Sequence, residues 1–135
     1  MIEIIAVLVI IGILASVALP KYMGLQKDAR MSAVKGMQGA MNGAIHITHS
    51  KAIVYGQTGA IGTINCDGKV IDLQYGFPKN VTALKDTISL NEGFTIDGET
   101  YTKDGAPVPE NCSVSYTAPT ATGGSPVLTV KDDGC

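Results

Sequence analysis

One acidic side chain, Glu3, lies within an apolar run that extends to Leu19. A carboxylate in a hydrocarbon environment is costly unless it is paired or protonated. No Lys or Arg follows Glu3 before the run ends, so a partner has to come from elsewhere, most simply the N-terminal amine of this chain or of a neighbouring one. At about 4 Å and an effective dielectric constant near 20, such a pair gains about 4 kcal/mol before desolvation. This energy suits docking and register better than stability. The alternative is a Glu at a membrane interface with little effect.

The three cysteines, Cys66, Cys112 and Cys135, have neither zinc-site nor redox-motif spacing. Cys112 and Cys135 bracket a stretch that predicts two strands and a loop. A disulfide there would close a loop of about 24 residues and contribute roughly 3 kcal/mol, which an oxidising compartment would permit. Two reduced, buried thiols are the alternative. Cys66 is then left over, either as a buried small apolar side chain or as a reactive thiol.

Other candidate chemical groups give weaker signals. His46 and His49 have a helical spacing that can bind a metal, but no second pair of ligands accompanies them, so surface or packed histidines are favoured. Asp97 and the Asp132-Asp133 pair lack an EF-hand-like loop. No nucleophile–base arrangement, phosphate-binding loop or paired-carboxylate site is present, so we expect no enzyme activity, no cofactor and no metal. The net charge of -2 and the lack of a basic stretch argue against nucleic-acid binding.

The apolar run that contains Glu3 predicts a helix that differs from the helices of soluble domains. At about 1.5 Å per residue, residues 4–19 extend roughly 24 Å, which is close to the thickness of a hydrocarbon core. The run has no basic segment before it and no clear small-residue cleavage site after it, unlike a cleaved signal peptide. It also lacks the polar face of a soluble helix. We therefore expect a membrane anchor, a packing surface for other copies, or both in turn.

Two residues weaken this helix, because Gly12 has poor helix propensity and Pro20 removes the hydrogen bond to the carbonyl of Ser16. Residues 12–24 should be its least stable part. This stretch is interpreted either as a simple kink or as a segment that can stretch.

The pattern after Pro20 is amphipathic and predicts that the helix continues to residue 54. Seven residues recur at three- and four-residue spacing and should form its buried face: Val34, Met37, Met41, Ala44, Ile45, Thr48 and Ala52. Gly36, Gly39 and Gly43 follow a similar spacing and offer a groove for the backbone of another chain. The predicted division is an apolar segment over 1–24 and a globular domain over 25–135, in which the amphipathic helix occupies 25–54.

The remaining sequence predicts a loop with short extended pieces over 55–68, followed by an antiparallel sheet over 69–135. Strands are expected at 69–73, 94–96, 99–103, 113–118 and 127–131, with a hairpin turn at Asp97-Gly98 and a short helix within 80–90. The fold class is therefore α+β, with one long helix packed on a small sheet.

Together these features resemble the bacterial type IV pilins. Glu3 is followed by the segment IIGILASVALPKY, in which Gly12, Leu14, Ala15, Ala18 and Pro20 fall where the signature of that family places them. The segments DLQYGFPKN and NCSVSYT and the terminal GC look most like the mannose-sensitive haemagglutinin type of major pilin. The likeness is strong over residues 1–30 and looser beyond.

The resemblance implies a structural subunit of a type IV pilus with the pilin fold. Such subunits are held in the inner membrane by a single pass, are trimmed and methylated by a prepilin peptidase, and are taken by the pilus assembly machinery into a helical homopolymer on the cell surface. Glu3 would correspond to the assembly carboxylate of the family, residues 12–20 to the stretch that loses helicity in the filament, and Cys112 and Cys135 to its disulfide. In the family, two residues precede the position of Met1, the first usually a Phe with a methylated amine.

The filament would serve adhesion, with motility or DNA uptake as further roles. The solvated stretches 56–65 and 119–126 are the candidates for receptor contacts. Two alternatives remain open: a type II secretion pseudopilin, and a single-span, membrane-anchored binding domain that does not polymerise.

Overall fold

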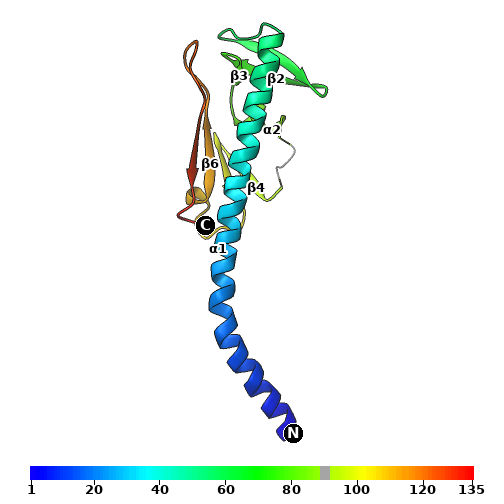
Figure 1. The fold of residues 1–135 in the computed structure, drawn as a ribbon, viewed down its shortest axis with the longest axis vertical. Helices are drawn as coiled ribbons and strands as arrows, with labels where there is room; N and C mark the ends of the chain where they lie inside the picture. Colours follow the sequence, from blue (N-terminus) through cyan, green and yellow to red (C-terminus); the bar gives the residue numbers. More distant parts are fainter. Residues whose placement is uncertain (89–91) are drawn as a thin grey trace.

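The fold was analysed in a computed structural model, which describes residues 1–88 and 92–135. Its dominant element is the helix α1 (Ile2–Val54), which continues without interruption through Gly12 and Pro20. Two small antiparallel sheets lie against the second half of this helix, and the first half extends alone beyond them (Figure 1). The chain is therefore α+β, as the sequence predicted.

The buried face of α1 is the one that the sequence pattern identified. All seven residues predicted for it are buried: Val34, Met37, Met41, Ala44, Ile45, Thr48 and Ala52. The spacing works because side chains three and four positions apart lie on the same side of a helix. The apolar periodicity of this half of α1 thus fixes which side faces the sheets.

The first sheet contains the strands β1 (Gly62–Cys66), β2 (Lys69–Gln74) and β3 (Phe77–Pro78), in that order and antiparallel. The sequence predicted β2, but it placed β1 inside a loop over 55–68. That prediction allowed short extended pieces but no paired strand, whereas residues 62–66 pair with β2 over their whole length. The glycines around the strand gave a loop signal that the pairing with β2 overrides. The candidate receptor loop 56–65 accordingly ends in a strand.

The second sheet has the order β4 (Phe94–Asp97), β5 (Thr100–Lys103), β6 (Ser113–Thr117) and β7 (Val127–Lys131). Its four strands confirm the predicted ones. The turn between β4 and β5 was predicted one residue too early, because Asp97 pairs with Thr100 and leaves Gly98-Glu99 as the turn. Gly98 has a φ of 58°, a conformation that glycine adopts without strain.

Two short helical segments connect the strands: a helix joins the first sheet to the second, and a 3₁₀ turn lies between β5 and β6. The helix α2 (Val81–Lys85) begins after Asn80, whose side chain accepts a hydrogen bond from the backbone N–H of Ala83 at 2.8 Å and so caps the helix. Residues 89–90 of the predicted helix over 80–90 lie outside the described residues. A 3₁₀ turn, η1 (Pro109–Asn111), precedes β6.

The sequence predicted one sheet, and the structure has two, which are joined by a buried tyrosine. The Tyr116 hydroxyl on β6 donates a hydrogen bond of 2.6 Å to the carbonyl of Pro78 on β3. Both residues are buried, and Tyr101 on β5 is also fully covered. The main core packs α1 against α2 and the second sheet, whereas Ala52 packs with Ile64, Ile71 and Leu73 of the first sheet in a smaller cluster.

The two buried tyrosines make the domain sensitive to alkali. Burial, with a smaller contribution from the charge of Asp86, raises the pKa of Tyr101 from 10.0 to about 12. Burial also raises the pKa of Tyr116, with Glu99 adding to the effect. A phenol that ionises more readily in the unfolded chain stabilises the fold fully below pH 10 and loses this contribution as the pH rises toward 12.

We therefore predict that the free energy of unfolding of the full chain falls between pH 10 and pH 12. Denaturant titrations at successive pH values measure the slope, and ultraviolet absorbance of tyrosinate reports the ionisation. Tyr101→Phe should flatten this dependence, whereas the exposed Tyr22→Phe control should leave it unchanged. An equal slope in the wild type and in Tyr101→Phe would contradict the assignment.

Candidate functional site: the exposed apolar helix and its anchor

The free half of α1 covers residues 2–29; over residues 4–19 it is apolar on every side, and none of its residues is buried against the described part of the chain. Its large apolar side chains are between about half and fully exposed, for example Ile4 at 65% and Leu14 at 64%. The most apolar window of α1 is long enough to cross a membrane by length and composition, and no residue of that window is buried. An exposed apolar surface of this size needs cover from lipid or from other chains.

Because residues 4–19 of α1 have no polar face, they have to be covered on all sides. A helix with one apolar stripe is satisfied by one partner, as in a two-stranded coiled coil. Residues 4–19 would leave most of their surface in water if a single partner packed on one side. Lipid surrounds the helix completely, and so does a ring of several neighbouring helices. The segment therefore fits a bilayer or the centre of a multi-chain bundle.

Polar and aromatic residues mark the end of this apolar segment. Lys21 and Tyr22 follow Pro20 directly, and both are exposed. Lys and Tyr at the end of an apolar helix commonly lie at the level of lipid headgroups, where the charged or hydroxyl end reaches water. The fully apolar stretch thus ends at Pro20, and the predicted boundary at residue 24 stays a prediction.

Glu3 lies in the first turn of α1 with its side chain exposed. Within the described part of the chain it has no ion-pair partner. A carboxylate in this position is favoured by the partial positive charge of the helix N-terminus, which contributes about 0.3–1 kcal/mol. In lipid or between apolar helices that contribution is far smaller than the desolvation cost of the charge, so the predicted need for an external cation remains.

Gly12 and Pro20 have no support from the rest of the chain. Nothing lies within 4 Å of a Cβ placed on Gly12 or Gly24. The Ser16 hydroxyl donates to the carbonyl of Ile13 at 2.7 Å, and the Ser16 carbonyl lacks the usual backbone donor because Pro20 has no N–H. The helix is intact here, but its weakest turns are also its least supported ones. The prediction that this segment stretches during assembly remains a prediction.

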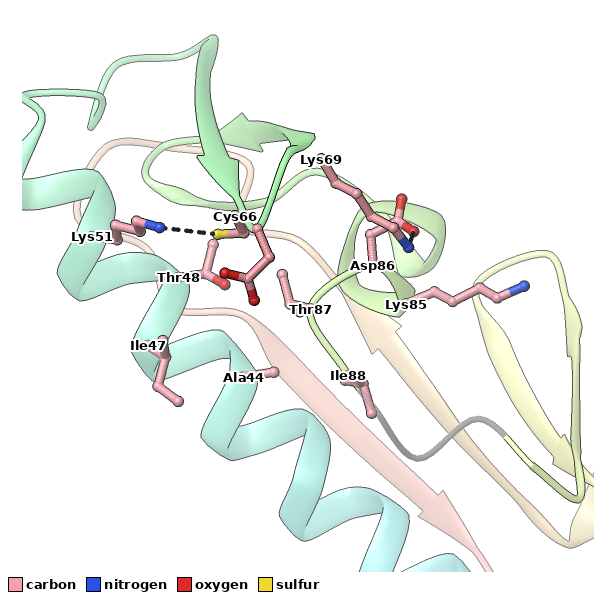
Figure 2. Close-up of a pocket in the computed structure, with 11 residues that line it drawn as sticks. Ala44, Ile47, Thr48, Lys51, Cys66, Lys69, Lys85, Asp86, Thr87 and Ile88 are labelled. Carbon is pink, nitrogen blue, oxygen red and sulfur yellow. Dashed lines mark hydrogen bonds and ion pairs between the residues drawn. The ribbon is translucent and has the colours of Figure 1, made fainter.

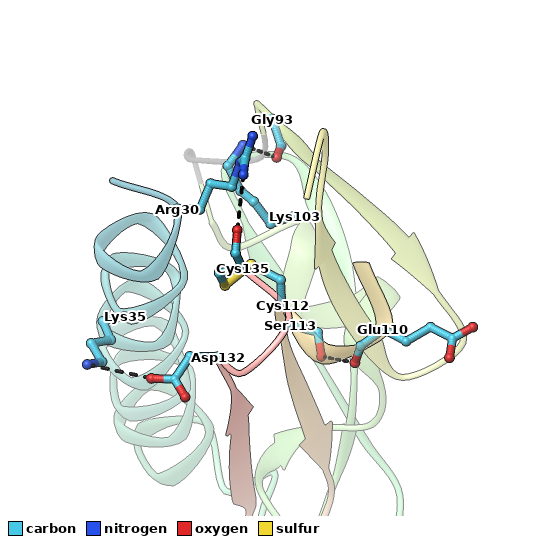
Figure 3. Close-up of a disulfide and its surroundings, with 9 residues drawn as sticks. All are labelled: Arg30, Lys35, Gly93, Lys103, Glu110, Cys112, Ser113, Asp132 and Cys135. Atoms are coloured by element: carbon cyan, nitrogen blue, oxygen red, sulfur yellow. Dashed lines mark hydrogen bonds and ion pairs between the residues drawn. A yellow bond between two sulfur atoms is a disulfide. The ribbon is translucent and has the colours of Figure 1, made fainter. Parts of the chain in front are cut away.

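The free half of α1 is anchored where it leaves the domain. There the Arg30 guanidinium donates a hydrogen bond of 3.0 Å to the carbonyl of Cys135 (Figure 3). Cys135 forms a disulfide with Cys112, which lies just before β6, and both cysteines are buried. The predicted disulfide is therefore present, and it places the end of the chain against α1. A nearby ion pair of 3.7 Å between Lys35 and Asp132 is exposed and contributes little.

The chain around Cys135 is tightly packed against the loop that precedes η1. Gly134 donates its N–H to the carbonyl of Asn111 at 2.9 Å and accepts from the N–H of Val108 at 3.2 Å. A Cβ on Gly134 would lie 2.6 Å from both the Asn111 Cβ and the Val108 carbonyl oxygen. Glycine is therefore required here for close approach, and the anchor combines the disulfide with this contact.

The remaining sequence candidates are placed apart from this site. His49 donates from Nδ1 to the carbonyl of Gly76 at 2.9 Å and stacks on Phe77 with a centroid separation of 3.9 Å, whereas His46 is exposed. The pair thus has the packed and surface roles that the sequence analysis favoured. Among the described residues there is no cluster of three potential metal ligands. Cys66 is half-buried and outside any disulfide, so the interpretation as a buried small apolar side chain was wrong.

The predicted glycine groove is open in this structure. Gly36, Gly39 and Gly43 are exposed, and no other described part of the chain lies within 4 Å of a Cβ placed on any of them. The fold itself therefore gives no reason for glycine at these helical positions, where each costs about 1 kcal/mol relative to alanine. Packing of another backbone along this groove remains a prediction.

Sequence reasoning missed Arg30 and Gly134 as parts of the anchor. Arg30 lies on the amphipathic part of the helix, where a charged residue is expected to face water, and its partner is a backbone carbonyl 105 positions away. Gly134 precedes Cys135, and its proximity to the predicted disulfide was the available signal.

Comparison of the chain with models of protein families, with curated proteins and with solved structures finds no match.

We predict that Gly134→Ala destabilises the domain by about 1–3 kcal/mol, because the added methyl group overlaps the neighbouring backbone. Denaturant unfolding under non-reducing conditions measures the change. Gly36→Ala is the matched control: it lies in open space on a helix, so it should raise stability by up to about 1 kcal/mol. A Gly134→Ala domain as stable as the wild type would contradict the close packing described here.

We also predict that a chain that begins at Leu25 remains folded, since the residues removed make no contact with the core. It should unfold cooperatively and stay monomeric in water without detergent. The full chain should instead require detergent or lipid. Circular dichroism and sedimentation measure both properties, and aggregation of the shortened chain would show that the apolar segment is needed for folding.

Proposed function

We propose that this protein is the structural major subunit of a type IV pilus, with the fold of that family. Its free apolar helix is held in the inner membrane before assembly and is then packed among the helices of other copies in a cell-surface filament. The observation that carries the proposal is the apolar half of α1, which is exposed on all sides and continuous with the half that packs on the domain. Such a helix fits both lipid and a bundle of identical helices.

Three features favour polymerisation over a simple membrane anchor. A carboxylate at Glu3 is costly in a passive anchor, but it is useful where a neighbouring amine has to be recognised. The unsupported turns at Gly12 and Pro20 allow the helix to lengthen as it is packed. The exposed glycines of α1 permit close approach of another backbone, for which the isolated chain has no use.

The anchor suits a subunit that carries load outside the cell. The disulfide and the Gly134 contact fix the end of the chain to the segment before β6, and Arg30 binds it to α1 near the point at which the apolar half emerges. A disulfide persists in the oxidising environment in which such a filament would operate. Adhesion is the proposed role of the filament, with motility or DNA uptake as additional uses.

The decisive experiment is electron microscopy of material sheared from cells that produce this chain, with antibody labelling of the globular domain. Labelled thin filaments on the surface support a pilin. Labelled short assemblies confined to the periplasm would favour a secretion pseudopilin. Monomeric chain found in membrane fractions, with no filament, would favour a membrane-anchored binding domain.

We predict that Glu3→Ala abolishes filaments or shortens them severely, while the globular domain stays folded. The reason is that the variant loses the charge that pairs with the amine of a neighbouring subunit. Filament yield is measured by shearing and electron microscopy, and folding by circular dichroism and the intact disulfide. Glu110→Ala, at an exposed acidic residue of the domain, is the control and should assemble normally. Normal filament yield from Glu3→Ala would remove the proposed role.

A further inference from the structure

A cavity of about 430 Å³ lies between α1, the β1–β2 turn and the end of α2. Figure 2 shows side chains from these three elements around a shared space. Its walls combine apolar and polar groups: Ala44, Ile47, Thr48, Lys51, Cys66, Asp67, Lys69, Lys85, Asp86, Thr87 and Ile88. It is separate from the free half of α1 and from the disulfide anchor, and the proposed assembly function does not use it.

The cavity contains the free thiol of the chain. Cys66, at the end of β1, is half-buried and has no disulfide partner. The Lys51 ammonium lies 3.8 Å from its sulfur and also donates to the carbonyl of Asn65 at 2.8 Å (Figure 2). An ammonium group has three donors, so Lys51 can bind a further acceptor beside the thiol.

Thr48 supplies an independent indication of a ligand. Thr48 is only 1% exposed, and its hydroxyl has no hydrogen-bond partner among the described residues. Figure 2 shows the side chain directed from α1 toward Cys66. A buried hydroxyl without a partner is costly, and such groups in native proteins commonly mark an absent water, ion or ligand. A polar atom of a molecule bound at Cys66 would satisfy it.

The charges around the cavity indicate the class of ligand. Lys51 and Lys69 provide ammonium groups, and Asp67 and Asp86 provide carboxylates, whereas the Lys85 side chain extends away from the shared space (Figure 2). Lys69 and Asp86 form an ion pair of 2.8 Å at a partly exposed position. Mixed charge of this kind complements a small zwitterion better than a simple anion or cation. The cavity volume suits a molecule the size of an amino acid or a short peptide.

We propose that Cys66 is a site of reversible mixed-disulfide formation with a small zwitterionic thiol of the cysteine or glutathione class. The Cys66 thiol releases its proton to solvent, and the thiolate attacks one sulfur of the low-molecular-weight disulfide RSSR. A bond forms between Cys66 and that sulfur, the S–S bond of RSSR breaks, and RS⁻ leaves. Lys51 binds a carboxylate of the attached group, and Thr48 contributes a hydrogen bond.

The test uses the full chain in detergent, treated with glutathione disulfide and followed by intact mass. The expected product carries one glutathione on Cys66, and Cys66→Ser forms none. The reaction with glutathione disulfide should be roughly fivefold faster than the reaction with the dicationic cystamine, because one or two exposed ion pairs with lysines of the cavity favour a reagent that carries carboxylates. Both rates are first corrected for the intrinsic reactivity of each reagent, measured on a small thiol. Lys51→Gln should reduce this preference, whereas Lys131→Gln, outside the cavity, should not.

A second variant separates ligand binding from folding. Thr48→Val removes the unpartnered hydroxyl, so it should not destabilise the domain, but it should lower the equilibrium fraction of the adduct by roughly fivefold, the effect of one lost hydrogen bond. Equal rates with glutathione disulfide and cystamine would overturn the proposal. So would an adduct that forms only in denaturant, or a Cys66-linked dimer in its place.

Discussion

An apolar helix that its own domain does not cover is the constraint on which this structure depends. Residues 4–19 are apolar on every side, so lipid or several other chains have to shield them from water. The rest of the chain is arranged around this requirement. The same helix continues into the domain, buries a seven-residue face there, and is held at its exit by Arg30 and the end of the chain.

The sequence was most informative where the physics is local. The three- and four-residue periodicity of α1 identified every residue of its buried face, and alternation identified β2 and the strands of the second sheet. The disulfide could be predicted because a small domain gains from one and Cys112 and Cys135 flank a strand pair. These features need no knowledge of which distant segments meet.

Pairing between distant segments could not be predicted in the same way. β1 was assigned to a loop with short extended pieces because of the glycines around it, and its strand character depends on β2. The division into two sheets depends on contacts such as the hydrogen bond from Tyr116 to Pro78, and the local sequence around these two residues does not indicate that they meet. The anchor had the same difficulty, since Arg30 meets a backbone carbonyl. The need of Glu3 for a partner was inferred from the apolar residues around it and stays a prediction.

The continuity of α1 also has a mechanical consequence. A pull on its free end, once the turns near Gly12 and Pro20 have lengthened, is transmitted along the continuous helix into the half that lies against the sheets (Figure 1). The load then acts in shear, because side chains from Val34 to Ala52 have to slide past their neighbours together rather than peel away in turn. Close-packed interfaces resist such sliding collectively. The globular domain thereby resists being pulled off the helix when the helix is under tension.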